Sequence, residues 1–532
     1  MDQSELHDLT VPELLHRGAE RHPAALALSV RSRLGHRERL SYPQVAVRME
    51  SMAAALHDLG LHPEERVALF LSNDAVREGV LTALGCWRLG AAVAPLNPRA
   101  SDDELAHGLQ LLQPALVVVL AEDAERIVRL YPGARLLVPG GGVQNALTWP
   151  DPDDHLPVDG PASTPSAETL SCLLFTSGTT ARAKAVMHCH RSQLHAGFAV
   201  GSAVGLRPGD IYQGAWPLFT SSVLNMACMS AWVSGCGVVL EEATLTNAAR
   251  LRLIANERAT VYHGVTSVLH FLVDEYARGG YRLPAIRRIA YGGAVMPPEV
   301  IAKFARHFPH ADQVHIWGMT ETGPAGTYLP PYFLPRKAGC IGGPMPACAV
   351  RVVDDNGAPM PPEEPGELAF SGPSMALGYF RNPEATAASF RDGWVLTGDV
   401  VRMDDEGHLH FVDRKKDIIN RGGMKISSAA VEAALYRHPD VREAAVIAVP
   451  HPRLGEDVAA CVVLRARARV GEDELARFCA DSLGDYERPR RWLFLDELPK
   501  NPMGKILKRE LRDRLGEGRA TAEQRSNDGS TR

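Results

Sequence analysis

The sequence LLFTSGTTARAKAVMHCH, residues 173–190, places a short apolar strand directly before a polar loop. The loop is rich in hydroxyl side chains and contains a glycine, and Lys184 follows it. Backbone N–H groups, hydroxyls and a lysine at the end of a strand are the groups that bind a polyphosphate. The candidate residues are Thr176, Ser177, Gly178, Thr179 and Thr180. The GxxxxGKS/T pattern of a Walker loop is absent, and taken alone the stretch fits a solvated turn equally well.

Short apolar runs alternate with amphipathic stretches on both sides of this segment. Residues 66–98 predict a strand, a helix and a second strand, and residues 115–120, ALVVVL, form a continuous apolar run. Such runs suit strands that are covered on both faces. The alternation therefore predicts an α/β architecture with parallel sheets.

The last third of the chain has a different character. From about residue 341, the strands RVVDD and GELAF and the turns DDNG and DDEGH predict a smaller β-rich unit. Residues 417–515 mix helical and strand patterns, as in the predicted helices 428–436 and 472–483. The tail after residue 515 has almost no apolar side chains, which predicts disorder.

Composition narrows the class of protein. At 532 residues the chain has room for three or four domains of about 150 residues. The net charge is −6, which argues against a protein that coats nucleic acid. The nine cysteines show no CxxC or zinc-type spacing, so we expect reduced, buried thiols. The N-terminus lacks a signal-peptide pattern and no apolar run reaches about 18 residues, so we expect a cytoplasmic protein without a membrane span.

Two further motifs suggest ligand contacts. HIWGMTETG, residues 315–323, places a hydroxyl beside a carboxylate at Thr320 and Glu321, and a carboxylate near a phosphate site commonly holds Mg²⁺. YGGAVMPPEV, residues 291–300, contains two glycines that allow close backbone approach to a flat ligand. Read singly, the first is often a helix start and the second a tight turn.

Three more motifs lie near the C-terminal end of the chain. DGWVLTGD ends at Asp399, a carboxylate suited to a ribose diol, and Arg414 in FVDRKKDIINRGGMKISS suits the same sugar. LPKNPMGKILKREL contains Lys505 directly after a turn. Each of these residues, taken alone, fits an ordinary surface position.

Together and in this order, the six motifs resemble the adenylate-forming superfamily of acyl-CoA synthetases, luciferases and adenylation domains. The resemblance runs from about residue 14 to residue 515. It implies an α/β fold with a large N-terminal domain of two sheet-and-helix subdomains plus a β-subdomain, and a small mobile α+β C-terminal domain. The implied bounds are 1–415 and 416–515, with a disordered tail at 516–532. It also implies that ATP and a carboxylic acid form an acyl-adenylate, from which a thiol or another nucleophile displaces AMP.

The resemblance carries roles to matching positions of this chain. Residues 176–184 look like the phosphate loop, and Gly292, Gly293, Ala294 and Trp317 match the nucleotide site. Thr320 and Glu321 match the catalytic pair, with Glu321 as the Mg²⁺ ligand. Asp399 and Arg414 match the ribose-binding pair, Lys416 the hinge, and Lys505 the adenylation lysine, a cation that neutralises charge developing at the α-phosphate. Gly422 and Gly423 resemble the segment that lets the pantetheine of coenzyme A pass close to the backbone.

Two departures from the family pattern affect these expectations. Ala181, Ala183 and Ala185 stand where the family usually has glycine, proline and glycine, which predicts weaker ATP handling if the loop needs positive φ angles. Thr220 stands where many members have histidine, so the usual aromatic gate of the acyl pocket is in doubt.

By the same resemblance, residues 216–230 should contribute to the acyl pocket, and they suggest the class of substrate. Residues 216–230, WPLFTSSVLNMACMS, contain no Asp, Glu, Lys or Arg, and an amino-acid substrate would leave its ammonium group unpaired. We therefore expect a neutral hydrophobic acid as substrate, with ATP, Mg²⁺ and coenzyme A. Two alternatives stay open: transfer to a carrier protein or an amine, and a homologue that has lost adenylation and only binds nucleotide or acyl-adenylate.

Overall fold

The computed structural model describes residues 3–32, 35–154, 164–176, 182–294, 296–334, 336–500 and 506–515. By its internal contacts the chain divides into two units. Unit 1 comprises Met1–Arg351, Ala369–Thr397 and Gly407–Leu409, and unit 2 comprises Val352–Leu368, Gly398–Glu406 and His410–Arg532. The domain bounds expected from the sequence, at residues 415 and 515, stay predictions.

Unit 1 contains one sheet in the strand order β19-β9-β8-β4-β3-β5-β6-β7. The predicted strand–helix–strand unit is confirmed, because β3 (Arg66–Phe70) and β4 (Ala92–Pro95) are parallel and α3 (Val76–Leu89) connects them. At the other end of the order, β8 pairs antiparallel with β9, and β9 with β19. The remaining strands are β5 (Leu116–Val119), β6 (Leu136–Val138), β7 (Leu147–Thr148), β8 (Leu170–Thr176), β9 (Lys184–Cys189) and β19 (Gly378–Tyr379).

A second sheet of unit 1 runs in the order β16-β15-β14-β13-β12-β10-β11-β1-β2. Its middle strands, from β14 to β1, are parallel, as the apolar runs predict. The strands are β1 (Leu26–Arg31), β2 (Arg37–Ser41), β10 (Ile211–Gly214), β11 (Gly237–Leu240), β12 (Val261–Val265), β13 (Arg288–Gly292), β14 (Asp312–Gly318), β15 (Gly326–Leu329) and β16 (Cys340–Pro344).

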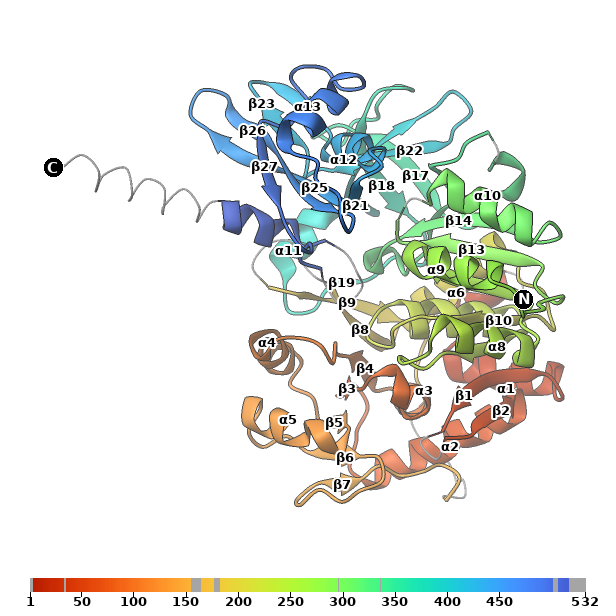
Figure 1. Ribbon diagram of the computed structural model, residues 1–532. Coiled ribbons are helices and arrows are strands. Elements are labelled where there is room, and N and C mark those ends of the chain that lie inside the picture. Colours follow the sequence, from red (N-terminus) through yellow and green to blue (C-terminus); the bar gives the residue numbers. More distant parts are fainter. Residues whose placement is uncertain are drawn as a thin grey trace. The chain divides into compact units, whose positions relative to one another are not determined.

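Helices cover these sheets on both sides. Several begin at side-chain caps: Thr10 and Glu13 form a capping box at α1, as do Ser101 and Glu104 at α4. Besides α3, the helices of unit 1 are α1 (Val11–Arg21), α2 (Tyr42–Asp58), α4 (Asp102–Leu112), α5 (Ala124–Leu130), α6 (His190–Val204), α7 (Met229–Val233), α8 (Asn247–Glu257), α9 (Thr266–Ala277), α10 (Pro298–His307) and α11 (Pro383–Ser389) (Figure 1). Short turns of helix lie at Ser4–Leu6, Asn73–Ala75, Ala121–Asp123, Ser222–Cys228, Thr320–Thr322 and Pro331–Phe333.

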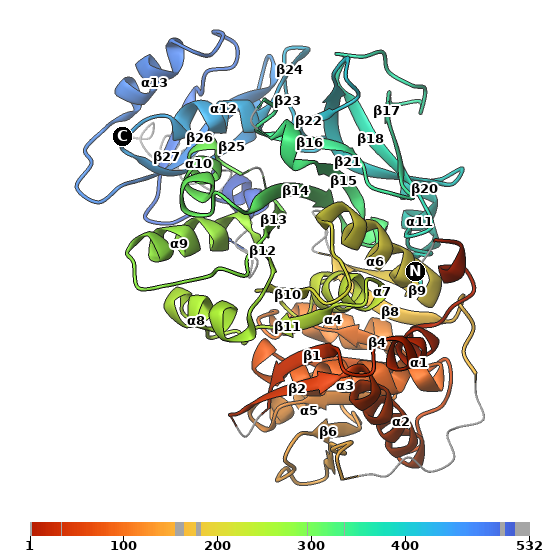
Figure 2. The ribbon, with the colours of Figure 1, turned by 90° about the vertical axis from the view of Figure 1, so that its right-hand side faces the viewer.

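Alternate residues of the central strands face different layers of helices. In β12, Val261 packs into the core shared with α6 and α7, and Tyr262 packs into the core formed with α8, α9 and α10. Figure 2 shows α8, α9 and α10 on one side of β12 and β13, with α6 and α7 on the other. This is the pattern expected of strands that are buried on both faces.

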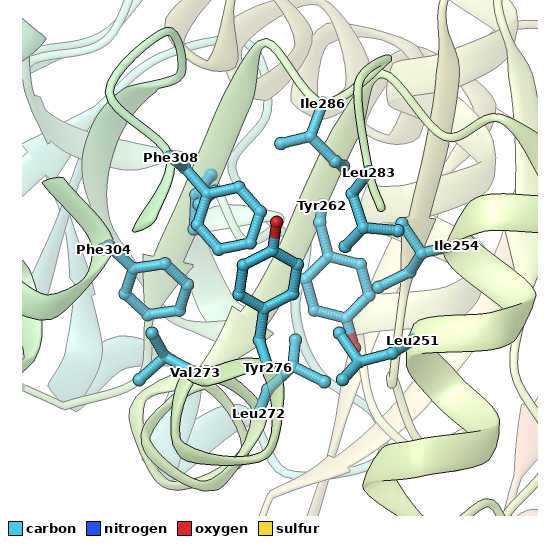
Figure 3. A pocket seen from close by; sticks show the side chains of 11 residues that line it. Leu251, Ile254, Tyr262, Leu272, Val273, Tyr276, Leu283, Ile286, Phe304 and Phe308 are labelled. Atoms are coloured by element: carbon cyan, nitrogen blue, oxygen red, sulfur yellow. The ribbon is translucent and has the colours of Figure 1, made fainter. Parts of the chain in front are cut away.

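An apolar pocket lies within the packing of α8, α9 and α10 (Figure 3). Leu251 and Ile254 of α8, Tyr276 of α9, and Phe304 and Phe308 of α10 line it. It belongs to the core on the α8–α10 side of the sheet, whereas residues 216–230 contribute to the core on the opposite side. The pocket is therefore separate from the predicted acyl segment.

The remaining strands belong to the smaller β-rich part and to the C-terminal part, and the C-terminal part lies within unit 2. Strands β17 (Ala349–Val353), β18 (Gly366–Ser371), β21 (Trp394–Met403) and β22 (Leu409–Arg414) follow one another in a sheet, and β20 (Phe390–Arg391) pairs with β21. The C-terminal part has a sheet in the order β24-β23-β26-β25, with β27 parallel to β26. Its elements are β23 (Ile419–Arg421), β24 (Met424–Ile426), β25 (Val441–His451), β26 (Gly455–Leu464), β27 (Arg491–Phe494), α12 (Ser428–Tyr436) and α13 (Glu472–Ala480).

The cysteines and the helices bear on two expectations from composition. The nine cysteines are free thiols, and eight of them are buried. Over the residues that the structure describes, none of the helices has the length and apolar character needed to cross a bilayer. The predicted disordered tail lies outside the described residues.

Candidate active site

The two ends of the predicted phosphate loop meet on one pair of strands. Thr176, the last residue of β8, lies opposite Lys184, the first residue of β9. Residues 171–174 of β8 are buried, so burial of this strand brings the loop to the strand end. The other candidate loop residues, Ser177, Gly178, Thr179 and Thr180, lie outside the described residues.

The alanines that depart from the family pattern do not carry the expected backbone cost where the structure describes them. Neither Ala183 nor Ala185 adopts a positive φ. Ala185 lies within β9 opposite Phe175 and is 1% exposed, and the Ala183 carbonyl lies 3.3 Å from His107 Nε2. The argument that alanine strains the loop therefore does not apply at these two positions, and Ala181 lies outside the described residues.

Tyr379 connects the phosphate-loop lysine to the predicted metal carboxylate. The Lys184 ammonium lies 4.6 Å from the centre of the Tyr379 ring, within cation–π range. The Tyr379 hydroxyl donates a hydrogen bond of 2.9 Å to Glu321 Oε1. Burial and the nearby Glu321 carboxylate raise the pKa of Tyr379, so the phenol stays protonated and donates at neutral pH.

Glu321 lies on a turn that is fixed from several sides. The turn Thr320–Thr322 follows β14, and Glu321 itself is 7% exposed. Gly323 ends the turn at φ +72°, and a Cβ there would lie 2.4 Å from the Ser374 carbonyl, so only glycine fits. The Thr320 carbonyl accepts a hydrogen bond of 2.9 Å from His188 Nε2.

His188 acts on this turn as a neutral hydrogen-bond donor. Burial lowers the pKa of His188 to about 4, so the ring is uncharged at neutral pH. The carbonyl of Thr320 can only accept, so Nε2 carries the proton. Within the described part of the chain, no group of three or more His, Cys, Asp or Glu side chains could hold a metal ion.

The donor set around Glu321 fits Mg²⁺ that is bound mainly through phosphate. Mg²⁺ in nucleotide sites takes one or two protein carboxylates and completes its coordination with phosphate oxygens and water. Glu321 supplies one buried carboxylate, and the Thr320 hydroxyl is adjacent in sequence. We therefore regard Glu321 as the residue that would hold the ion together with the triphosphate.

The predicted nucleotide-side glycines lie at the carboxyl end of β13. A Cβ on Gly292 would lie 2.5 Å from the Ile316 carbonyl of the neighbouring strand, and Gly293 has φ +80°. Ala294 is exposed, and its carbonyl accepts a hydrogen bond of 3.0 Å from Thr266 Oγ1. Trp317 lies near the end of β14, so these candidates share one edge of a parallel sheet, where α/β folds bind ligands.

Unit 2 holds the predicted ribose pair. Asp399 Oδ1 lies 2.5 Å from Arg414 Nε, and the two residues stand on the neighbouring strands β21 and β22. Asp399 is 1% exposed, whereas the Arg414 side chain is 35% exposed. The structure thus brings together the two residues that the sequence analysis paired.

The predicted hinge and thiol segments also lie in unit 2. Lys416 is exposed in the turn after β22. Just before it, the buried Asp413 accepts hydrogen bonds of 2.8 Å from Ser428 Oγ and 3.2 Å from Ala429 N at the start of α12. Gly422 and Gly423 form the turn between β23 and β24, with φ +60° and +91°. Lys505 lies outside the described residues.

The predicted acyl segment, residues 216–230, is held by a buried asparagine. Asn73 Nδ2 donates to the Trp216 carbonyl at 2.6 Å and to the Glu241 carbonyl at 3.0 Å, and its Oδ1 accepts from Leu218 N at 2.7 Å. The segment continues as a π-helical stretch at Ser222–Cys228, an irregularity that is frequent at functional sites.

A buried histidine packs against the start of this segment. His263 Nδ1 lies 2.5 Å from the Tyr212 hydroxyl, and the His263 ring meets the Trp216 ring edge-on at 5.7 Å. Burial lowers the pKa of His263 to about 3, so this side chain adds no charge at neutral pH.

Sequence reasoning did not single out Tyr379 and Asn73. Tyr379 lies in the stretch ALGYF and Asn73 in LSND, and neither has a spacing that marks a ligand site. Their partners lie far away in the chain: 58 residues separate Tyr379 from Glu321, and 143 separate Asn73 from Trp216. Only the fold brings these groups together.

Comparison with protein families covers most of the chain. The AMP-binding enzyme model matches residues 15–380, and the model of the AMP-binding enzyme C-terminal domain matches residues 430–505. A feruloyl-CoA synthase of an Amycolatopsis species is 34% identical over 477 residues, which is 90% of this chain and 94% of that protein. The long-chain-fatty-acid–CoA ligase FadD13 of Mycobacterium tuberculosis is 31% identical, over 89% of this chain and 93% of its own length.

A solved structure agrees with these matches. The crystal structure of ATP-bound MatB from Rhodopseudomonas palustris superposes with a TM-score of 0.83 at 27% identity. The match covers 95% of this chain and 99% of that one.

Proposed function

Because the chain belongs to the AMP-binding enzymes and is an AMP-forming acyl-CoA synthetase, we propose that it activates a neutral, hydrophobic carboxylic acid. ATP and coenzyme A are substrates of this family. The acid attacks the α-phosphate of ATP, which gives an acyl-adenylate and releases pyrophosphate. The thiol of coenzyme A then attacks the acyl carbon and releases AMP.

The site residues have distinct parts in this proposal. Lys184 and the loop before it bind the phosphates, Glu321 binds Mg²⁺ with the help of Thr320, and Gly292, Gly293, Ala294 and Trp317 border the nucleotide. Asp399 and Arg414 bind the ribose. Lys505 supplies the cation that neutralises the charge developing at the α-phosphate, since an anionic acid must approach an anionic phosphate. Lys416 acts as the hinge, and Gly422 and Gly423 serve the thiol step.

The class of acid rests on the absence of charge in residues 216–230. No Asp, Glu, Lys or Arg occurs in this stretch, and its aliphatic side chains, such as Leu218 and Val223, belong to a buried core. The Glu241 carbonyl, like that of Trp216, accepts a hydrogen bond from Asn73. The Glu241 carboxylate is already bound, by Arg250 Nε at 2.5 Å and by Gln213 Nε2 at 2.9 Å. An ammonium group on the substrate would therefore lack a partner here, and burying an unpaired charge is expensive.

The names of the relatives support the same class. One is named for feruloyl-CoA and another for long-chain fatty acids, and neither of these acyl groups carries an ammonium group.

A pyrophosphate-release assay tests the proposal. The purified chain is given ATP, Mg²⁺ and a panel of aliphatic, aromatic, polycyclic and amino acids, each with and without coenzyme A, and products are identified by mass spectrometry. We expect turnover with neutral hydrophobic acids, a thioester product when coenzyme A is present, and no turnover with amino acids. Preference for an amino acid would contradict the acid class. Pyrophosphate release without any thioester would contradict coenzyme A as acceptor.

A further inference from the structure

We propose that Tyr379 is a positioning residue that holds the Lys184 ammonium and the Glu321 carboxylate in place for a triphosphate and its divalent cation. The inference rests on the proposed function, because it assigns Tyr379 to the same nucleotide site. Tyr379 contacts the two groups through different parts of its side chain: its ring meets Lys184 and its hydroxyl meets Glu321.

The surroundings of Tyr379 fix the position of its ring. Its strand, β19, pairs with β9, which places Tyr379 opposite Val186, two residues after Lys184. Its backbone N–H donates to Thr386 Oγ1 at 2.9 Å, and the Phe390 ring meets the Tyr379 ring edge-on at 5.6 Å. Tyr379 itself is 6% exposed. A side chain held in this way can orient others.

The arrangement also keeps two opposite charges apart. An ammonium and a carboxylate that were free to approach would form an ion pair, and neither would then be available to a phosphate or a metal ion. The phenol gives each group a separate partner, the ring face for the cation and the hydroxyl for the anion. Hydrogen bonds to a metal-binding carboxylate orient it, and loss of such a bond typically weakens metal binding by about 10–100-fold.

Tyr379→Phe is the variant that separates the two contacts. It removes the hydroxyl that binds Glu321 and keeps the ring that lies beside Lys184. Calorimetry without the acid substrate measures ATP binding as a function of Mg²⁺ concentration, and AMP binding without metal. We expect the half-saturating Mg²⁺ concentration to rise at least about tenfold. We expect AMP affinity to stay unchanged, because AMP lacks the phosphates that bind the cation, and the melting temperature to fall only modestly, because the buried Glu321 carboxylate loses one hydrogen-bond partner.

Tyr281→Phe is the matched control. The Tyr281 hydroxyl donates a hydrogen bond of 2.8 Å to Glu275 Oε1, the same pair of groups, outside the candidate site. This variant should leave the Mg²⁺ dependence unchanged. Tyr379→Leu removes both contacts of Tyr379 and should also weaken ATP binding in the absence of Mg²⁺.

The outcomes separate this inference from the proposed function. If the unaltered chain binds ATP with Mg²⁺ and Tyr379→Phe shows the same Mg²⁺ dependence, the role of Tyr379 is overturned and the proposed function stands. An equal loss of AMP and Mg²⁺–ATP binding in Tyr379→Phe would also overturn it, because it would indicate general damage to the site. If the unaltered chain binds no ATP, the proposed function fails, and this inference fails with it.

Discussion

Asp399 Oδ1 and Arg414 Nε lie 2.5 Å apart on the neighbouring strands β21 and β22. The Asp399 carboxylate is buried, whereas the Arg414 side chain is partly open to solvent. The guanidinium can therefore contact a ligand while it is paired with the carboxylate. Because strand pairing sets the two backbones and the ion pair orients the buried carboxylate, less ordering of Asp399 remains to be done when a ribose binds. The pair therefore supports its proposed role in nucleotide binding.

We predict that Asp399→Ala strongly weakens the binding of both ATP and AMP. Hydrogen bonds to a charged group are worth roughly 1.5–3 kcal/mol, which corresponds to about a 10- to 150-fold loss of affinity. Calorimetric titration with each nucleotide measures the effect. Asp399→Asn keeps the shape of the side chain but not its charge, so its nucleotide affinity should lie between that of the unaltered chain and that of Asp399→Ala. Unchanged affinity in Asp399→Ala would remove this residue from the site.

Lys505→Ala should abolish acyl-adenylate formation and spare thioester formation from a supplied adenylate. In the proposed role, the lysine neutralises charge only while the acid attacks the α-phosphate, so the second half-reaction would not need it. Pyrophosphate release reports the first step, and conversion of a synthetic acyl-adenylate with coenzyme A reports the second. An equal loss of both steps would show that Lys505 does not have this role.

The structure changes the expectation for the alanine-bearing loop. Ala185 lies inside β9, packs in the core around Leu173 and Leu105, and has no positive φ. Ala185→Gly should therefore lower stability by about 0.5–1 kcal/mol, because glycine in a strand loses more conformational entropy on folding. It should not improve the KM for ATP. Urea unfolding and ATP kinetics measure the two effects, and a lower KM would revive the idea of a strained loop.

Local patterns predicted much of the fold. The apolar runs and their spacing gave β3, α3 and β4 in their order, and the helix predicted at 428–436 is α12, Ser428–Tyr436. Helix ends were less certain: the helix predicted from residue 472 to 483 ends at Ala480 in the structure. Ends depend on capping and on contacts beyond the segment, which periodicity does not contain.

The candidate site could be predicted only where its residues lie in recognisable motifs. Asp399 and Arg414 were paired by resemblance, and the structure places them in contact. Tyr379 was missed because its two partners come from other strands and turns, and no spacing along the chain encodes such a contact. The loop conformation at Ala183 and Ala185 was also missed, since a family preference for glycine does not show that this chain adopts positive φ there.

Asn73→Ala should raise the KM for the acid without changing the KM for ATP. Two of its three hydrogen bonds hold Trp216 and Leu218 at the start of the predicted acyl segment, and the third goes to the Glu241 carbonyl. Loss of the amide leaves buried backbone groups unpaired, at about 1–3 kcal/mol for such a group, so stability should also fall. Gln313→Ala is the control, because Gln313 is a buried amide that donates to the Ile301 carbonyl outside the segment. If both variants raise the KM for the acid equally, the effect on the pocket is not specific to Asn73.

Acid should destabilise unit 1 through its buried histidines. Burial lowers the pKa of His188 and His195 to about 4, and that of His190 and His263 to about 3. An unfolded histidine titrates near 6.5, so between that pH and the lowered value the unfolded chain binds more protons than the folded one. The contribution of these rings to the free energy of unfolding is therefore fully present above about pH 6.5. It falls as the pH decreases, by up to about 1.4 kcal/mol per pH unit for each group.

Urea midpoints from tryptophan fluorescence at pH 7.5 and pH 5.5 measure the loss. His263→Asn keeps an acceptor for Tyr212 and removes one titrating group, so its midpoint should fall less over this range than that of the unaltered chain. His62→Asn, at an exposed position, should fall as much as the unaltered chain. Midpoints that do not change with pH, or an equal fall in both variants, would contradict the assignment of the acid sensitivity to burial of these rings.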